Sequence, residues 1–358
     1  MMSPHRRADQ GNASGGSKSP DFNRLLTALR CGVPDRVPTA EITIDEGAKE
    51  AFLGRPVNDL RTDVEFYIEA GYDFLTLGRR LAGYPPVWPA ARRENYYQVQ
   101  RAVAHGAMEG TIRCREDYRH YPWMKPSDLD LGILDDVVPL LPPSMRVIRY
   151  CSPVFQMTWM LMGFEALSYA FVDDPGLVTS VMDRIFEVVR REVQDAVQRD
   201  VVGAVWFGDD IAIKDRLMVP PEFLRAHFFP KLAELGRICA GRGIPLLYHT
   251  DGNVSSVLPD IIACGVSALH PIDPLGMDIV SVKAQVAGRL CVIGGVDVGL
   301  LLTGTPAEVA EATKGRLSSL APGGGYVAGS SNSIPRAVPV ENYRAMLDTV
   351  REHGAYPR

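Results

Sequence analysis

Short apolar runs alternate with longer stretches of helical period along most of this chain, and this alternation constrains its fold more than any other feature. Eight runs have the length and composition of strands buried on both faces, and they occupy residues 37–42, 74–77, 146–150, 203–207, 244–248, 266–270, 290–293 and 326–328. Runs of this kind are typical of parallel sheets covered by helices. Eight strand–helix repeats with right-handed crossovers fit a closed (β/α)8 TIM barrel better than an open sheet.

Helix-start signals fall between these runs. Asp174 before Pro175 has the residue types of an N-cap and a first-turn proline, and the sequence Pro220-Pro221-Glu222 indicates another helix start. Thr305 has an acidic residue three positions later, which is the spacing of a capping box. A helix is also expected over residues 63–70, whose apolar side chains share one face. Both kinds of element therefore support an α/β fold.

Residues 81–145 interrupt the alternation. Residues 96–104 and 111–115 have the pattern of an inserted β-hairpin after the second strand, and proline-rich loops follow them. Loops after barrel strands cover the active face, so this insertion is a candidate lid or dimer contact. No shift in composition indicates a second domain, and residues 21–358 are predicted to form one barrel.

The composition narrows the function classes. The chain of 358 residues is 46% hydrophobic and 23% charged, and its net charge of −5 gives no reason to expect nucleic acid or a membrane surface as a partner. No apolar stretch approaches the ~18 residues of a membrane helix. Residues 1–20 lack the apolar core of a signal peptide and are predicted to be a disordered leader of a cytoplasmic protein. The six cysteines have no C-x-x-C spacing and are expected to be free thiols.

The fifth apolar run ends in the sequence His249-Thr250-Asp251-Gly252-Asn253. The carboxyl end of a buried strand is where ligands bind in α/β proteins. A histidine and an aspartate two residues apart at this point can bind a metal ion, transfer a proton or bind a cation. The alternative is an Asx-type turn, in which Asp251 only bonds the nearby backbone.

Polar residues also follow the other runs. In chain order the strand ends supply Glu41; Arg79 and Arg80; Tyr150 and Cys151; Asp209 and Asp210; His249 and Asp251; His270 and Asp273; Asp297; and Ser330, Ser331 and Asn332. In a closed barrel these side chains converge on one mouth. Crowded carboxylates repel one another, so the mouth is expected to hold a metal ion, a cationic substrate group or a carboxyl group of raised pKa. Asp209 and Asp210 point oppositely on an extended strand, so one of them is expected to reach the centre.

Each of these residues also has a structural explanation when taken singly. Asp210 has the residue type of an N-cap, His270 that of a buried core histidine and Asp297 that of a turn residue. The chain contains no Walker A sequence, no G-x-S-x-G, no H-E-x-x-H and no D-x-H-x-x-G motif of the kind that holds a cobamide. The strand ends taken together are therefore the main indication of function in this sequence.

The chain resembles the uroporphyrinogen decarboxylase superfamily, which includes the cobamide-dependent methyltransferases. The stretches that carry the resemblance are residues 32–38, Tyr150-Cys151-Ser152-Pro153-Val154, Gly208-Asp209-Asp210, Pro220-Pro221-Glu222-Phe223, residues 249–253, Gly294-Gly295-Val296-Asp297, residues 304–309, residues 323–326 and residues 338–342. They follow one another in order over residues 21–350. The resemblance implies a TIM barrel and, since this superfamily often forms dimers, a homodimer.

The chain departs from both known branches. Decarboxylases of the family carry an arginine-rich segment after the first strand, whereas here residues 41–47 are acidic. The methyltransferase branch binds zinc through His-x-Cys-Gly and a later cysteine, whereas Asp251 stands at the first cysteine position and Ser331 or Asn332 near the second. Metal binding through His249 and Asp251, joined by Glu41 or Asp297, is then predicted to use nitrogen and oxygen ligands, which leave the metal's identity open between zinc and other divalent ions.

The resemblance favours an enzyme that moves a methyl group between a small methylated substrate or carrier and a cobamide supplied by a separate corrinoid protein. The residues expected to be catalytic are His249, Asp209, Asp251 and Asp297, and those expected to bind substrate are Glu41, Arg79, Arg80, Tyr150, Asp210, Asn253 and Asn332. Two alternatives remain open. One is cofactor-free decarboxylation of a smaller acid, and the other is a barrel that binds a ligand without catalysis.

Overall fold

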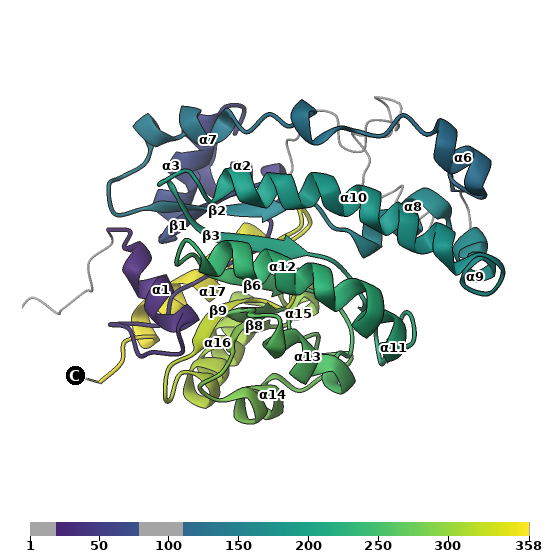
Figure 1. Ribbon diagram of the computed structural model, residues 1–358. Coiled ribbons are helices and arrows are strands. Elements are labelled where there is room, and N and C mark those ends of the chain that lie inside the picture. Colours follow the sequence, from purple (N-terminus) through teal and green to yellow (C-terminus); the bar gives the residue numbers. More distant parts are fainter. Residues whose placement is uncertain (1–18, 79–109, 358) are drawn as a thin grey trace, which may run out of the picture.

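A curled sheet of seven parallel strands forms the centre of the protein. The computed structural model describes residues 19–78 and 110–357 (Figure 1). The strands, in the order in which they pair, are β1 (Phe74–Leu77), β2 (Arg146–Cys151), β3 (Val202–Gly208), β6 (Leu246–His249), β7 (Ala268–His270), β8 (Cys291–Val296) and β9 (Tyr326–Ser330). All seven coincide with predicted strands to within three residues at either end, which confirms the α/β assignment. A short antiparallel pair, β4 (Ala212–Ile213) and β5 (Arg216–Leu217), follows β3.

The prediction of a strand over residues 37–42 is wrong. Thr39 and Ile44 make only single parallel bridges, to Ala328 and Ile334. Ala40 N donates to the Ala328 carbonyl at 2.8 Å, but Pro38 has no N–H group with which to extend a ladder. The segment therefore runs beside β9 as irregular chain. The described fold is TIM-barrel-like, with seven strands in place of the closed eight-stranded ladder that we expected.

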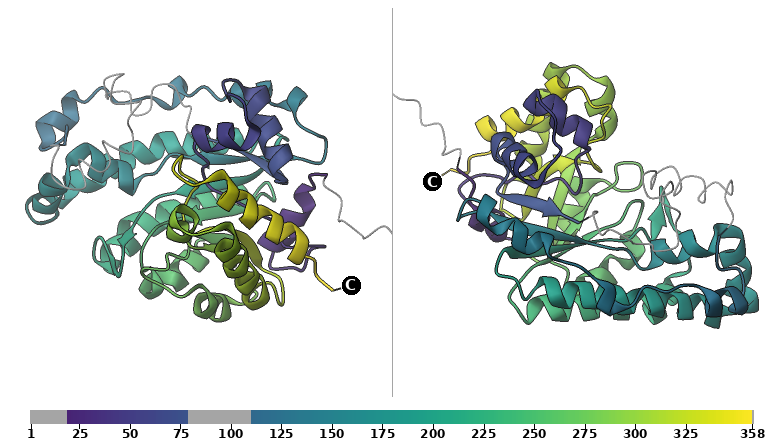
Figure 2. Two further views of the ribbon diagram at one scale, coloured as in Figure 1. Left: turned by 180° about the vertical axis from the view of Figure 1, so that it is seen from behind. Right: turned by 90° about the horizontal axis from the view of Figure 1, so that it is seen from above.

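Helices cover the outside of the curled sheet (Figures 1 and 2). They are α1 (Phe22–Leu29), α2 (Glu46–Leu53), α3 (Leu60–Ala70), α6 (Arg115–His120), α7 (Ile133–Asp136), α8 (Phe155–Met162), α9 (Phe164–Asp173), α10 (Pro175–Ala196), α11 (Pro221–Phe223), α12 (Phe229–Ala240), α13 (Leu258–Ala263), α14 (Ile279–Val286), α15 (Val298–Thr303), α16 (Pro306–Leu320) and α17 (Val340–His353). A π-helical turn, Leu224–Phe228, joins α11 to α12. Short 3-10 turns lie at Pro126–Asp128, Val138–Leu140 and Ser255–Val257.

The predicted helix starts are confirmed. The Asp174 side chain accepts from Leu177 N at the start of α10, and Thr305 forms a capping box with Glu308 at the start of α16. Helix α3 begins three residues before the predicted start, because Asp59 forms a capping box with Thr62.

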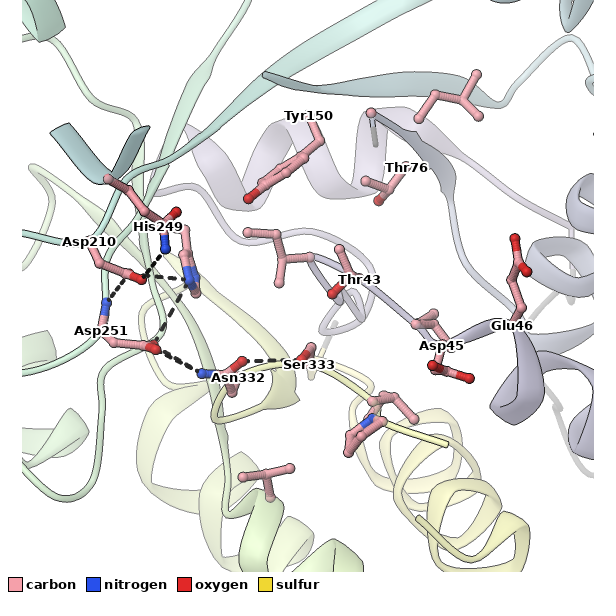
Figure 3. Close-up of a pocket in the computed structure, with 18 of the residues that line it drawn as sticks. Thr43, Asp45, Glu46, Thr76, Tyr150, Asp210, His249, Asp251, Asn332 and Ser333 are labelled. Atoms are coloured by element: carbon pink, nitrogen blue, oxygen red, sulfur yellow. Dashed lines mark hydrogen bonds and ion pairs between the residues drawn. The ribbon is translucent and has the colours of Figure 1, made fainter. Parts of the chain in front are cut away.

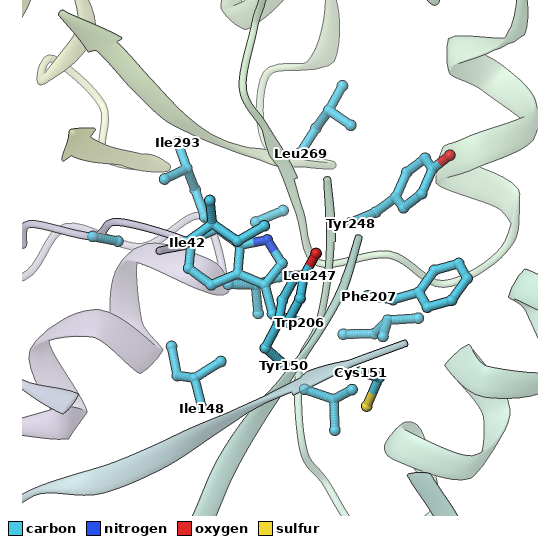
Figure 4. Packing of buried hydrophobic residues seen from close by; sticks show 14 of the residues in the cluster. Ile42, Ile148, Tyr150, Cys151, Trp206, Phe207, Leu247, Tyr248, Leu269 and Ile293 are labelled. Atoms are coloured by element: carbon cyan, nitrogen blue, oxygen red, sulfur yellow. The ribbon is translucent and has the colours of Figure 1, made fainter. Parts of the chain in front are cut away.

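The strands are buried on both faces, as their apolar sequences predict. In Figure 4 the Trp206 side chain lies among aliphatic side chains, including Ile293 from β8 and Ile42 from the irregular segment beside β9. The next residue, Phe207, belongs to the opposite face of β3, where its ring stacks with that of Tyr248 at 6.0 Å between centroids. Both faces of β3 therefore contribute to the core.

The insertion after the second predicted strand falls partly within the described residues. Arg79, Arg80 and the first predicted hairpin strand, residues 96–104, lie outside the described residues. The second hairpin strand is not formed: residues 111–114 are irregular, Thr111 N and Ile112 N both donate to the Leu161 carbonyl, and α6 begins at Arg115. These bonds to α8 replace the strand pairing that the sequence pattern suggested.

The predicted leader falls mostly outside the described residues, which begin at Ser19. Pro20, at its end, is buried, and its carbonyl accepts from Ser144 Oγ at 2.6 Å. All six cysteines are free, as expected. Among the described residues, no helix combines the length and the apolar composition that crossing a membrane requires.

Candidate metal and substrate site

A cavity of about 1330 Å³ lies at the carboxyl ends of the strands. Five of the predicted site residues line it, namely Tyr150, Asp210, His249, Asp251 and Asn332. They follow β2, β3, β6 and β9, or lie at the ends of these strands. Figure 3 shows the Asp210, His249 and Asp251 side chains pointing toward one another at one side of this cavity. The convergence predicted from the strand ends is therefore present for these residues.

Asp210, His249 and Asp251 have the geometry of a metal-binding triad. One ligand atom from each residue lies within 4.8 Å of the other two. His249 Nε2 is 3.7 Å from Asp210 Oδ1 and 3.9 Å from Asp251 Oδ1. One imidazole and two carboxylates form a donor set that zinc, manganese or iron accepts, so these residues fit a divalent metal ion.

Two amide side chains orient the carboxylates of the triad. Asn332 Nδ2 donates to both oxygens of Asp251, at 3.0 and 3.1 Å. Gln156 Nε2 donates to Asp210 Oδ2 at 3.2 Å, and Asp251 N donates to Asp210 Oδ1 at 2.9 Å. Outer groups of this kind fix the direction of metal ligands. Gln156 was not among the predicted site residues, because it lies in the apolar stretch of α8 rather than at a strand end.

The ring of His249 is held by a second histidine. Its Nδ1 lies 2.8 Å from Nδ1 of His270, and the two residues are register partners at the ends of β6 and β7. His270 is fully buried, and this burial, with the neighbouring His249, holds the pKa of its imidazole well below the usual value. The bond leaves His249 Nε2 facing Asp210 and Asp251.

The carboxylates make this part of the cavity strongly acidic. Burial raises the pKa of Asp251 well above its usual value, and the charges of Asp210 and Asp273 raise it further. A proton or a metal ion at the triad relieves this repulsion.

Three of the four Lys and Arg side chains that line the cavity are paired with acids. Arg149 pairs with Glu192 at 2.8 Å, Arg336 with Asp45 at 3.4 Å, and Lys49 with Asp63. Among the described lining residues, seven carboxylates stand against four Lys and Arg side chains. A polyanionic ligand would therefore meet net repulsion, whereas a metal ion or a neutral or cationic group would not.

Asp209 lies outside the cavity. Its carboxylate is fully buried and accepts three backbone N–H groups, from Val154 at 2.7 Å, Phe155 at 2.8 Å and Gln156 at 2.7 Å. It therefore holds the start of α8 against β3. Only one residue of the Asp209–Asp210 pair reaches the centre, as the alternation of side chains predicted.

Three further predicted site residues do not line the cavity. Asp297 accepts from Gly299 N at 2.8 Å and caps α15. Asn253 accepts from Ser255 N at 2.9 Å and donates to the Gly276 carbonyl at 3.0 Å, which is an Asx-type turn role. The structure does not bring either side chain, or that of Glu41, into the triad.

Glu41 forms a separate buried site. Its two oxygens accept from Ser330 N at 2.7 Å and from Ser330 Oγ at 2.6 Å. Burial raises the pKa of Glu41 to about 8, against the two hydrogen bonds, which lower it.

We expect Glu41 to make the protein less stable as the pH rises from about 4.5 to about 8. The unfolded chain releases this proton near pH 4.5 and the folded chain near pH 8, so the folded state binds more protons between these values. Glu41→Gln removes the titration while keeping one acceptor for Ser330 N. Urea denaturation at pH 5 and pH 8 should show the variant gaining stability relative to the wild type by up to about 1.4 kcal/mol for each pH unit. A constant difference between the two proteins would contradict this prediction.

Comparison with known proteins identifies the family. Residues 134–353 match the sequence model of the uroporphyrinogen decarboxylase (URO-D) family. The chain belongs to this family. The resemblance that the sequence motifs indicated is thereby confirmed.

The relatives of this URO-D family member are distant. It is 24% identical to a uroporphyrinogen decarboxylase from Actinobacillus succinogenes over 216 residues, which cover 57% of each chain. It is 24% identical to a uroporphyrinogen decarboxylase from Alkalilimnicola ehrlichii over 265 residues, which cover 69% of this chain and 68% of the other. The match thus spans between about half and two thirds of these relatives.

A solved structure shares the fold. A methyltransferase from Methanosarcina mazei superimposes with a TM-score of 0.63 at 16% sequence identity, and the match covers 92% of this chain and 97% of that one. The shared fold supports a TIM-barrel-like architecture for the URO-D family member described here.

Proposed function

We propose that this URO-D family protein moves a methyl group between a small methylated substrate or carrier and a separate corrinoid protein, with a divalent metal ion bound by Asp210, His249 and Asp251. The observation that carries the proposal is the convergence of these three side chains, within 4.8 Å of one another, in a cavity at the strand ends. The third ligand in this proposal is Asp210. From the sequence we had expected Glu41 or Asp297 in this role. The chain has no cobamide-binding motif, so the cobamide would be brought by the partner.

The electrostatics of the cavity support a substrate unlike a porphyrinogen. A substrate with many carboxylates needs several unpaired cations, whereas three of the four described lining cations, Arg149, Arg336 and Lys49, are each paired with an acid. Arg79 and Arg80, which we expected to bind substrate, lie outside the described residues. We therefore propose a small substrate without a cluster of carboxylates.

The protein's own groups have defined roles in this proposal. Asp210, His249 and Asp251 bind the metal, which when bound supplies Lewis acidity to the heteroatom that carries the methyl group. Asn332 and Gln156 hold the two carboxylates in the direction that metal binding needs. Tyr150 lines the same cavity and helps to enclose the substrate.

A second candidate function is cofactor-free decarboxylation of a small acid. The observation that favours it is the raised pKa of Asp251, which keeps a proton available in a site shared with Asp210. In this reaction the carboxylate of the substrate leaves as carbon dioxide, and Asp251 protonates the carbon that carried it. The two candidates differ in whether a metal or a proton relieves the repulsion between the carboxylates.

Metal analysis of the purified protein tests the proposal. We expect one divalent metal ion for each chain, retained in the His353→Ala/Asp348→Ala control and lost in a His249→Ala/Asp251→Ala variant. The control makes the same two substitutions on helix α17, where neither residue lines the cavity. If neither the wild type nor the control binds metal, even after incubation with zinc, the metal-assisted methyltransferase is rejected. Decarboxylation then becomes the better account.

A further inference from the structure

The imidazole of His270 contacts the ring of His249 from the neighbouring strand. The two Nδ1 atoms lie 2.8 Å apart, and the rings are inclined by only 30° with their centroids 5.0 Å apart. The Cα atoms are register partners in adjacent parallel strands, so the sheet itself fixes the distance between the rings. His270 is fully buried, and its Nε2 has no hydrogen-bond partner among the described residues.

A count of protons limits the pair to two arrangements. Neutral histidine carries one ring proton, and a hydrogen bond between two Nδ1 atoms contains one proton. If His270 Nδ1 carries it, His249 has its own proton on Nε2. If His249 Nδ1 carries it, the His249 Nε2 lone pair faces Asp210 and Asp251, and the proton of His270 is on its Nε2. A metal ion at the triad requires the second arrangement, because a protonated nitrogen cannot be a ligand.

We infer that His270 is a positioning residue for the metal site, and that it acts by accepting the His249 Nδ1 proton. This inference rests on the proposed metal-binding function. A second group that accepts the remaining N–H of a metal-bound histidine fixes its tautomer and raises its basicity as a ligand. In most sites this acceptor is a carboxylate or a backbone carbonyl, whereas here it is a buried neutral imidazole.

Metal binding is therefore coupled to a change inside the core. On passing from the first arrangement to the second, the His270 Nδ1 proton moves to His249 Nδ1, the His249 Nε2 proton leaves to solvent, and His270 Nε2 takes up one proton from solvent. Neither ring changes its net charge. The new His270 N–H lies in a core where the indole of Trp206 stands perpendicular at 5.1 Å, and a buried N–H without an acceptor opposes binding.

The inference can be tested with Zn²⁺ as a diamagnetic probe. Long-range ¹H–¹⁵N spectra of protein labelled with ¹⁵N-histidine report which ring nitrogen carries the proton. On saturation with Zn²⁺ we expect His249 to be protonated at Nδ1 and His270 at Nε2. A Zn²⁺ form in which His270 keeps its proton on Nδ1 would overturn the inference, and this measurement needs only the wild-type protein.

Two variants test the energetic role. His270→Phe keeps a ring but removes the acceptor, and we expect it to weaken Zn²⁺ binding by about 10- to 100-fold. His270→Gln offers a carbonyl oxygen to His249 Nδ1–H and should retain most of the affinity. His353→Phe, on the exposed end of α17, is the control for loss of a histidine. If the wild type binds Zn²⁺ and His270→Phe binds it equally well, only this inference fails; if the wild type binds none, the proposed metal site fails with it.

Discussion

Glu192→Ala is expected to lower the free energy of unfolding by about 3–5 kcal/mol, because it leaves a guanidinium group buried without its counter-ion. Arg149 on β2 and Glu192 on α10 pair at 2.8 Å, and their side chains are 2% and 1% exposed. Arg149 Nε and Nη2 both donate to Glu192 Oε1, so the substitution removes the acceptor of both bonds. The pair joins the sheet to the longest described helix, α10. Its loss should therefore destabilise the whole fold rather than one segment.

Chemical denaturation of Glu192→Ala and Glu187→Ala measures this effect with a matched control. Glu187 lies on the same helix and pairs with Arg184, but the two side chains are 47% and 33% exposed. An exposed pair three residues apart contributes about 0–1 kcal/mol. Equal losses in the two variants would show that the burial of the Arg149–Glu192 pair does not determine its contribution to stability.

We expect substitution of Asp209 to lower the stability of the fold, and substitution of its neighbour Asp210 to lower the affinity for metal. Asp209→Ala removes the acceptor of three buried backbone N–H groups at the start of α8 and should cost about 3–5 kcal/mol of stability. Asp210→Ala removes a carboxylate that faces the cavity and should leave the fold stable, because it relieves repulsion with Asp251. The same change should reduce divalent-metal affinity by at least about 100-fold, since it deletes one of three ligands.

Thermal unfolding and metal titration of the two variants distinguish these roles. The expected pattern is a large fall in melting temperature for Asp209→Ala and a loss of metal binding for Asp210→Ala. If Asp209→Ala melts like the wild type, the carboxylate does not hold α8 in place. If Asp210→Ala binds metal as tightly as the wild type, Asp210 is not a ligand and the proposed set of three ligands is wrong.

The strand pattern was predictable from the sequence because both faces of the sheet are buried. A run such as Leu246–Tyr248 must be apolar throughout when helices cover one face and the barrel interior the other, so the signal is strong even in a short segment. The segment 37–42 has the same apolar character, but Pro38 removes a donor and only isolated bridges form. Hydrophobicity therefore predicted that this segment is buried and did not predict its hydrogen bonding.

The candidate site was predictable where its residues follow strands closely. Asp210, His249 and Asp251 lie within two residues of strand ends, and parallel strands bring such positions to one edge. Asp297 satisfies the same rule, since it follows the end of β8 directly, but it caps α15 instead. Asn253 lies four residues after β6 and forms a local Asx-type turn. Residue type does not separate these two outcomes, since aspartate and asparagine serve both as ligands and as caps.

The sequence by itself determined the α/β class, the order of seven strands, the helix starts and the strand-end segment 249–253, because each depends on local composition and spacing. Only the tertiary structure decided which of the carboxylates meet, that Gln156 and Asn332 orient them, and that His270 pairs with His249. These contacts join residues that lie tens of positions apart in the chain. Examples are the contact of Asp210 with His249 and that of Asn332 with Asp251. Their distances depend on strand register and on the curvature of the sheet, which local sequence does not specify.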